Sequence, residues 1–261
     1  MAKTPENTAN VTGNVMMYEN PQPLTKDKHA KFGVKSVEKP FTFMEKSHFM
    51  PLTAVEFGAA CSSFPIIFAG DDKTPLAVMG IRGEENLFVK DGIFDNSYYM
   101  PSFARRYPFV LAGDTANDRF VVCVDESAEC VTNKKPDQAF FEGDEPSKFT
   151  NEAFEFLKAF EQDRRTTEAM ITRFKELDLF EQKEMNFQGN NADGSLSEKQ
   201  KIADYFAVTD EKLRGLDEKT LKEFMDNGYL SVAYAHMVSL GNWQRLVNMT
   251  LLRSQNETKK A

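Results

Sequence analysis

FMPLTAVEFGAACSSFPIIFAGD, at residues 49–71, is followed by a second stretch built on the same pattern, YYMPSFARRYPFVLAGD, at residues 98–114. Each stretch runs from an aromatic residue and Met-Pro through a helix-like segment to an aromatic residue and Pro. Three apolar residues and Ala-Gly-Asp complete each copy. The same elements in the same order indicate an internal duplication.

The prolines of the two copies predict where helices begin and end. Proline suits the first turn of a helix, where no backbone donor is needed, so Pro51 and Pro101 are expected to mark helix starts. Pro65 and Pro108 disfavour helical geometry in the residue before them, so each helix should end there and an extended run should begin.

A turn and a second strand are expected after each extended run. They are Gly70-Asp71 before residues 76–81, and Gly113-Asp114 before residues 119–125. The repeating unit is therefore helix, strand, turn, strand, with residues 86–89 as an additional strand. We predict an α+β fold, in which a mixed or antiparallel sheet domain built on this repeat precedes a mainly helical C-terminal part.

Composition and periodicity suggest four regions of the chain. We expect a flexible arm at residues 1–28, the α+β repeat domain at 29–132, a linker at 133–148 and the helical region at 149–255. Within the helical region, NNADG at 190–194 predicts a turn between strand-like flanks. His236 lies on an apolar helix face, where a histidine is more often a satisfied core residue than a ligand.

The charge and the apolar content limit the classes of partner. A net charge of −8 on 261 residues argues against nucleic acid and anionic membrane surfaces as partners. No segment approaches the roughly 18 apolar residues of a membrane span, and the N-terminal sequence lacks a secretory signal pattern. We expect a cytoplasmic protein that does not insert into a membrane.

Residues suited to catalysis or metal binding are sparse. Three cysteines, Cys61, Cys123 and Cys130, are expected to be buried free thiols. The three histidines are far apart in sequence, and no glycine-rich phosphate loop occurs. Two acidic pairs, Glu84-Glu85 and Asp125-Glu126, could meet as an acid/base pair or hold a divalent ion, but a solvated sheet rim is the favoured interpretation. We predict no catalytic residues, no metal site and no cofactor.

The adjacent arginines Arg105 and Arg106 are the strongest candidates for a binding site. The helix dipole favours a cation at a helix C-terminus by roughly 0.3 to 1 kcal/mol, and an internal salt bridge would also explain them. The other copy has Ser62 and Ser63 at this junction, so the junction itself does not require positive charge. Neighbouring helical residues point about 100° apart, so one arginine is expected to serve the structure and the other to face a ligand.

Five segments resemble the SapC family of bacterial proteins, named from a surface-layer protein locus, and the resemblance covers about residues 30–250. The segments are HFMPLTAVEFGAACSSFPIIFA, GEENLFVKDG, YYMPSFARRYPF, FVVCVDE and LSVAYAHMVSLGNWQRL. The RRYPF and ENLFV elements carry most of it. The resemblance implies a bacterial source and a link to cell-surface systems, with relatives encoded near outer-membrane receptors and flavin-dependent halogenases. It supplies no catalytic residues.

Together these observations predict a non-enzymatic binding or accessory protein. The expected ligand- or partner-binding residues are Arg105, Arg106, Tyr107, Asn86 and His48. The partner is expected to be a protein or a small anionic ligand, and a homodimer through residues 149–255 is predicted. The alternative is an enzyme that acts on a small anionic or peptide substrate at the Arg105, Arg106 and Tyr107 junction.

Overall fold

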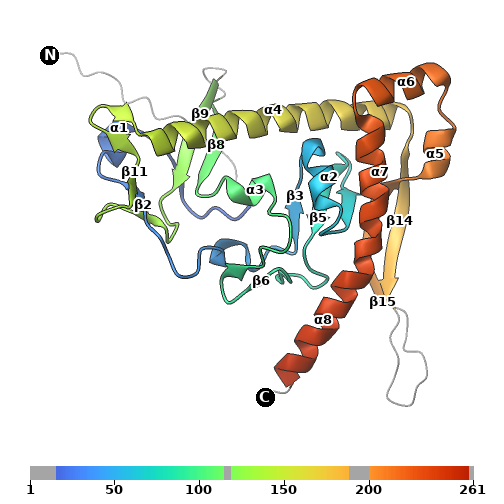
Figure 1. The fold of residues 1–261 in the computed structure, drawn as a ribbon, viewed down its shortest axis with the longest axis horizontal. Helices are drawn as coiled ribbons and strands as arrows, with labels where there is room; N and C mark the ends of the chain where they lie inside the picture. Colours follow the sequence, from blue (N-terminus) through green and yellow to red (C-terminus); the bar gives the residue numbers. More distant parts are fainter. Residues whose placement is uncertain (1–15, 115–118, 188–199, 259–261) are drawn as a thin grey trace. The chain divides into compact units, whose positions relative to one another are not determined.

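The structure is a computed structural model that describes residues 16–114, 119–187 and 200–258. Figure 1 labels the helices and strands. The chain forms two compact units, and each is discontinuous in sequence. The first unit comprises Met1–Met44, Asp91–Ile93 and Arg105–Glu161, and the second comprises Glu45–Lys90, Phe94–Ala104 and Gln162–Ala261. Each unit is described by itself.

The first unit is built on small antiparallel sheets. One has the order β1 (Pro21–Pro23), β9 (Arg119–Asp125), β8 (Phe109–Asp114), and another has the order β10 (Val131–Thr132), β2 (Gly33–Val34), β11 (Gln138–Ala139). The remaining elements are β12 (Phe141–Glu142), β13 (Glu145–Pro146), α1 (Lys26–His29), η1 (Thr42–Met44) and the beginning of α4 (Lys148–Glu176).

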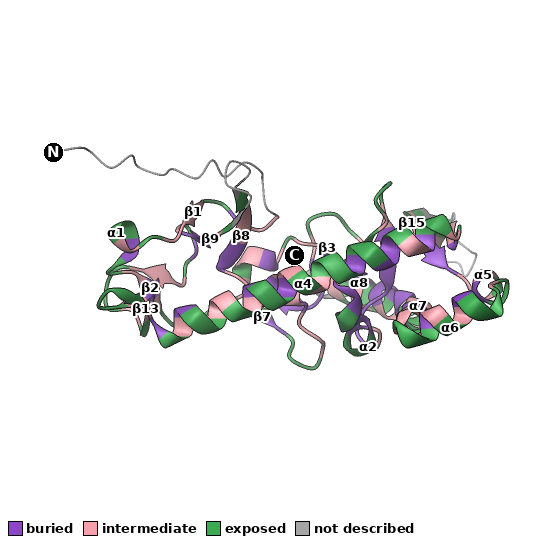
Figure 2. Cartoon of the chain, turned by 90° about the horizontal axis from the view of Figure 1, so that it is seen from above, coloured by how far each residue is buried: buried purple, intermediate pink, exposed green. Residues whose placement is uncertain are grey.

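Two apolar clusters hold the first unit together. Phe109, Val124, Phe140 and Leu157 form one, and Tyr18, Val110 and Cys123 form the other. Since β8 and β9 contribute to both, their hairpin is the centre of this unit. Helix α4 begins after Ser147, whose hydroxyl accepts a hydrogen bond from the backbone N–H of Thr150 as an N-cap. Buried residues recur along α4 at helical spacing (Figure 2).

The second unit contains a five-stranded antiparallel sheet. Its order is β14 (Phe180–Phe187), β15 (Gln200–Val208), β4 (Ile66–Ala69), β5 (Thr74–Val78), β3 (Phe49–Pro51). The helices are η2 (Ala54–Glu56), α2 (Phe57–Ala60), α5 (Asp210–Arg214), α6 (Glu218–Asp226), α7 (Tyr229–Ser239), η3 (Leu240–Asn242) and α8 (Trp243–Thr258). Three short elements, β6 (Val89–Lys90), β7 (Ile93–Phe94) and α3 (Ser102–Arg105), lie where the chain passes between units.

Helix α7 packs against α2, β4 and β15 and carries polar groups that bind the sheet. The fully buried His236 accepts a hydrogen bond from the Val208 backbone N–H at 3.1 Å and lies 2.8 Å from the Ile66 carbonyl oxygen. Burial lowers the pKa of His236 to about 4, so this imidazole is neutral near pH 7. The interpretation of His236 as a satisfied core residue is confirmed.

The predicted α+β class with a helical C-terminal part is confirmed, whereas the internal repeat is not. Both copies contain a hairpin, β4–β5 in one and β8–β9 in the other. The prediction that Pro51 starts a helix is wrong, because Pro51 ends strand β3, opposite Leu76 of β5. The prolines before the hairpins also differ, since only the Tyr107–Pro108 bond is cis among the described residues.

The predicted boundaries differ from this arrangement in two places. Within the expected arm, residues 21–23 form β1 and residues 26–29 form α1. Residues 138–146 of the expected linker form the short strands β11, β12 and β13. The predicted turn at 190–194 lies outside the described residues, and its strand-like flanks are β14 and β15.

Candidate functional site

The arginine junction of the first unit lies between α3 and β8. Arg105 ends α3, and its guanidinium carbon is 5.4 Å from the centre of the Phe156 ring. The guanidinium carbon of Arg106 is 5.0 Å from the Phe160 ring and 5.6 Å from the Tyr18 ring. Phe156 and Phe160 are one helical turn apart on α4, so both arginines lie over one aromatic face of that helix.

The two arginines differ in environment. Arg105 is exposed, whereas Arg106 is half-buried. Burial lowers the pKa of Arg106, an effect opposed by its charge interaction and hydrogen bond with Tyr18. Arg105 is therefore the more exposed of the two arginines, and Arg106 is the more enclosed.

Two tyrosines complete this junction. Tyr107 stacks on Phe43, with ring centres 3.9 Å apart and an interplanar angle of 11°. The Tyr18 hydroxyl donates a hydrogen bond of 2.7 Å to the Phe109 carbonyl oxygen. Burial raises the pKa of both phenols, so they are neutral in the physiological range.

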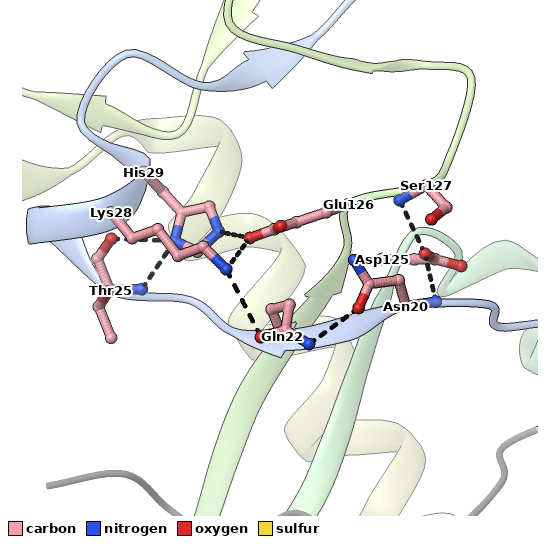
Figure 3. Close-up of polar contacts among 8 residues, drawn as sticks. All are labelled: Asn20, Gln22, Thr25, Lys28, His29, Asp125, Glu126 and Ser127. Carbon is pink, nitrogen blue, oxygen red and sulfur yellow. Dashed lines mark hydrogen bonds and ion pairs between the residues drawn. The ribbon is translucent and has the colours of Figure 1, made fainter.

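Asp125, at the end of β9, is fully buried and holds the backbone of the N-terminal segment (Figure 3). Its carboxylate accepts hydrogen bonds from the backbone N–H groups of Glu19 at 2.9 Å, Asn20 at 3.0 Å and Ser127 at 3.0 Å. Three donors compensate a buried carboxylate for its lost hydration. Asp125 therefore fixes where residues 19 and 20 cross the end of β9.

The next residue, Glu126, binds α1. Its Oε1 lies 2.9 Å from His29 Nε2 and 2.6 Å from Lys28 Nζ (Figure 3). Burial acts to raise the pKa of Glu126, but the hydrogen bonds from Lys28 and His29 outweigh it and lower that pKa. The Nδ1 atom of the buried His29 lies near the Thr25 backbone, 3.2 Å from its nitrogen and 3.1 Å from its oxygen. Both ring nitrogens of His29 thus have internal partners.

The interpretation of Asp125 and Glu126 as a solvated rim is wrong for Asp125, because it is fully buried and bound to backbone donors. Glu84 and Glu85 belong to the second unit. Within residues 16–114, 119–187 and 200–258, no three His, Cys, Asp or Glu side chains are grouped so that they could hold a metal ion. Cys61, Cys123 and Cys130 carry free thiols, as expected, although only Cys123 is fully buried. Burial raises the pKa of Cys123 to about 11.

His48 and Asn86 lie in the second unit, and both contact the Met79-Gly80 segment. The His48 carbonyl oxygen accepts hydrogen bonds from the N–H groups of Met79 at 2.7 Å and Gly80 at 3.0 Å. The buried Asn86 side chain accepts from the Phe88 N–H at 3.0 Å. A Cβ atom at Gly80 would lie 1.9 Å from the Glu85 carbonyl oxygen, so this close approach requires glycine.

The five predicted binding residues therefore form two groups, one in each unit. Arg105, Arg106 and Tyr107 lie together in the first unit, and His48 and Asn86 both contact Met79 in the second. Sequence reasoning missed Tyr18 and the backbone-binding role of Asp125, because residues 1–28 were expected to be flexible. Pro21 and Pro23 were an available signal, since alternate prolines in an extended segment are typical of an edge strand.

The serine junction of the first copy also proves to have a cation. Arg245 Nη1, from α8, donates hydrogen bonds to the Ser62 carbonyl oxygen at 2.6 Å and the Ser63 carbonyl oxygen at 3.2 Å. Asn242 Nδ2 donates to the carbonyl oxygens of Cys61 at 2.7 Å and Phe64 at 3.1 Å. The positive charge at this junction thus comes from a residue far along the chain.

Comparison with known proteins identifies one family. Residues 24–246 match SapC, which is most of the chain. No curated protein and no solved structure is significantly similar to the chain. Each helix among the described residues is either too short or too polar to span a bilayer.

Proposed function

Because the chain belongs to the SapC family, we propose that it is a non-enzymatic binding or accessory protein of a bacterial cell-surface or outer-membrane-receptor-linked system. The observation that carries this proposal is that ionisable side chains of the first unit are engaged in holding that unit together. Those best suited to proton transfer, Asp125, Glu126 and His29, bind other parts of the same unit.

A catalytic acid or base must exchange a proton with a substrate. Asp125 is enclosed by three backbone donors, and the imidazole of His29 is fully buried between Glu126 and the Thr25 backbone. These contacts order the N-terminal segment against β9. They support a role for Asp125, Glu126 and His29 in shaping a binding surface. The protein partner contacts this surface at Arg105 and Tyr107.

A second candidate is an enzyme acting on a small anionic or peptide substrate at the same junction. The exposure of Arg105 favours it, because an exposed guanidinium can bind a carboxylate or phosphate in bidentate geometry. In both cases the proposed ligand-binding residues of the first unit are Arg105, Arg106 and Tyr107. His48 and Asn86 form a second proposed contact group. We place the protein in the cytoplasm, with neither nucleic acid nor a membrane span among its interactions.

Capture from lysate separates the two candidates. The immobilised full-length protein is incubated with lysate of the source bacterium, and retained proteins and metabolites are both identified by mass spectrometry. The accessory role predicts a retained protein in stoichiometric amount. Retention of a single small anionic metabolite without any protein would support the enzyme instead.

A further inference from the structure

The segment Tyr18–Leu24 lies along β9 in the manner of a bound peptide. Strand β1 pairs antiparallel with β9, with Pro21 opposite Asp125 and Pro23 opposite Cys123. The Leu24 N–H then donates to the Val122 carbonyl oxygen at 2.8 Å. Addition of an extended segment to a sheet edge is a common mode of peptide recognition.

The side chain of Tyr18 anchors this segment. It is buried to 7% exposure and packs with Val110 and Cys123. Its ring lies 5.6 Å from the guanidinium carbon of Arg106, and its hydroxyl donates to the Phe109 carbonyl oxygen. A tyrosine held by apolar contact, a cation and a hydrogen bond has the features of an interface anchor residue.

Main-chain groups of the segment are bound as well. The two carboxylate oxygens of Asp125 accept from consecutive N–H groups, those of Glu19 and Asn20. The Asn20 carbonyl oxygen accepts from the Glu126 N–H at 3.1 Å. Pro21 and Pro23 lack N–H groups and favour extended backbone, so little conformational entropy is lost when this segment binds.

Most of the segment lies outside the range that matches the family, whereas the surface beneath it lies inside that range. Arg106, Phe109 and Asp125 lie inside the range 24–246 that matches SapC, whereas residues 18–23 precede it. The residues that form the surface thus lie within the range matched by the family.

We propose that this surface, the β9 edge site formed by Arg106, Phe109, Val122, Asp125 and Glu126, is a peptide-binding site that residues 18–24 occupy in cis. Its ligand is an extended segment of a protein partner that carries a tyrosine with prolines three and five residues later. The inference rests on the proposed binding function and names its partner chemistry. A tethered segment has an effective concentration in the millimolar range, so a partner's segment binds only when the cis segment is weakened or outcompeted.

The test uses the full-length protein and a fluorescein-labelled peptide with the sequence of residues 16–25, MMYENPQPLT. Tyr18→Ala removes the cis anchor and leaves the β9 edge site intact. Fluorescence anisotropy should show that this variant binds the peptide at least about tenfold more tightly than the unmodified protein. The peptide in which Ala replaces Tyr should bind neither the Tyr18→Ala variant nor the unmodified protein. Met225→Ala, which alters an exposed apolar residue of α6 in the second unit, should bind like the unmodified protein.

A folded Tyr18→Ala variant that does not bind the peptide at about 1 mM would overturn the inference. If that variant does not fold, Tyr18→Phe decides, because it keeps the ring and removes only the hydroxyl, with its hydrogen bonds to Phe109 and Arg106. Tyr18→Phe should bind the peptide more tightly than the unmodified protein, and equal affinities would overturn the inference. A partner captured from lysate without peptide binding would preserve the proposed function and remove only this site. Peptide binding without any captured partner would preserve this site and remove the proposed function.

Discussion

Arg245 and Ser62 are 183 residues apart in sequence, and Arg245 Nη1 donates a hydrogen bond of 2.6 Å to the Ser62 carbonyl oxygen. The helix-to-strand junction after α2 therefore has an arginine, as does the junction after α3. After α3 the arginine is adjacent in sequence, whereas after α2 it comes from α8. A cation at a helix C-terminus binds carbonyl groups that have no partner within the helix.

Arg245→Ser should lower the free energy of unfolding by about 1–3 kcal/mol, because the Ser62 and Ser63 carbonyl oxygens lose a charged donor. Urea unfolding at pH 7 measures the change. The matched control is Arg214→Ser, which removes an exposed arginine from the last turn of α5 and should change stability by less than about 1 kcal/mol. Equal effects of the two substitutions would contradict the capping role.

Arg106→Ser should destabilise the protein by about 2 kcal/mol, since Arg106 is half-buried and its guanidinium lies near the rings of Tyr18 and Phe160. Arg105→Ser should cost less than about 1 kcal/mol, because Arg105 is exposed. Thermal and urea unfolding of the two single variants provide the comparison. The assignment of separate roles is wrong if Arg105→Ser is the more destabilising change.

His236 should make the folded protein sensitive to acid. The imidazole pKa is lowered from 6.5 to about 4 by burial, so between these values the unfolded chain binds more protons than the folded one. Stability should therefore fall as the pH drops from about 6.5 to 4, by on the order of 3 kcal/mol for this group. NMR titration of the His236 ring checks the premise, and a midpoint near 6.5 would refute it.

We expect a homodimer through residues 149–255. Tyr234 and Val238, one turn apart on α7, are 49% and 68% exposed, which is typical of a face that another subunit covers. Light scattering of the full-length protein at tens of micromolar, about the concentration at which specific dimers persist, should give a dimer. The double variant Tyr234→Glu and Val238→Glu should be monomeric. Val55→Glu, at an exposed apolar residue of η2, should remain dimeric, and a monomeric unmodified protein would disprove the expectation.

Local features of this fold were predictable from local sequence. The hairpins β4–β5 and β8–β9 follow from apolar runs beside Ala-Gly-Asp. The burial of His236 followed from the apolar residues at helical spacing around it.

Long-range features were not predictable in the same way. The hydrogen bond between Arg245 and Ser62 joins segments with no sequence signal that relates them. The burial of Asp125 depends on backbone donors from residues 19 and 20, and no side-chain pattern marks backbone donors. The division into two units escaped prediction because each unit is assembled from separate stretches of chain.

The most direct test of the proposed function compares lysate capture by Arg105→Ser with capture by Arg214→Ser. Both substitutions replace an exposed arginine that is the last residue of a short helix. Only Arg105 belongs to the proposed binding junction. Quantitative mass spectrometry should show that Arg214→Ser retains the protein partner of the unmodified protein and that Arg105→Ser loses it, while both variants stay folded. Equal retention of that partner by the two variants would contradict binding at the Arg105 junction.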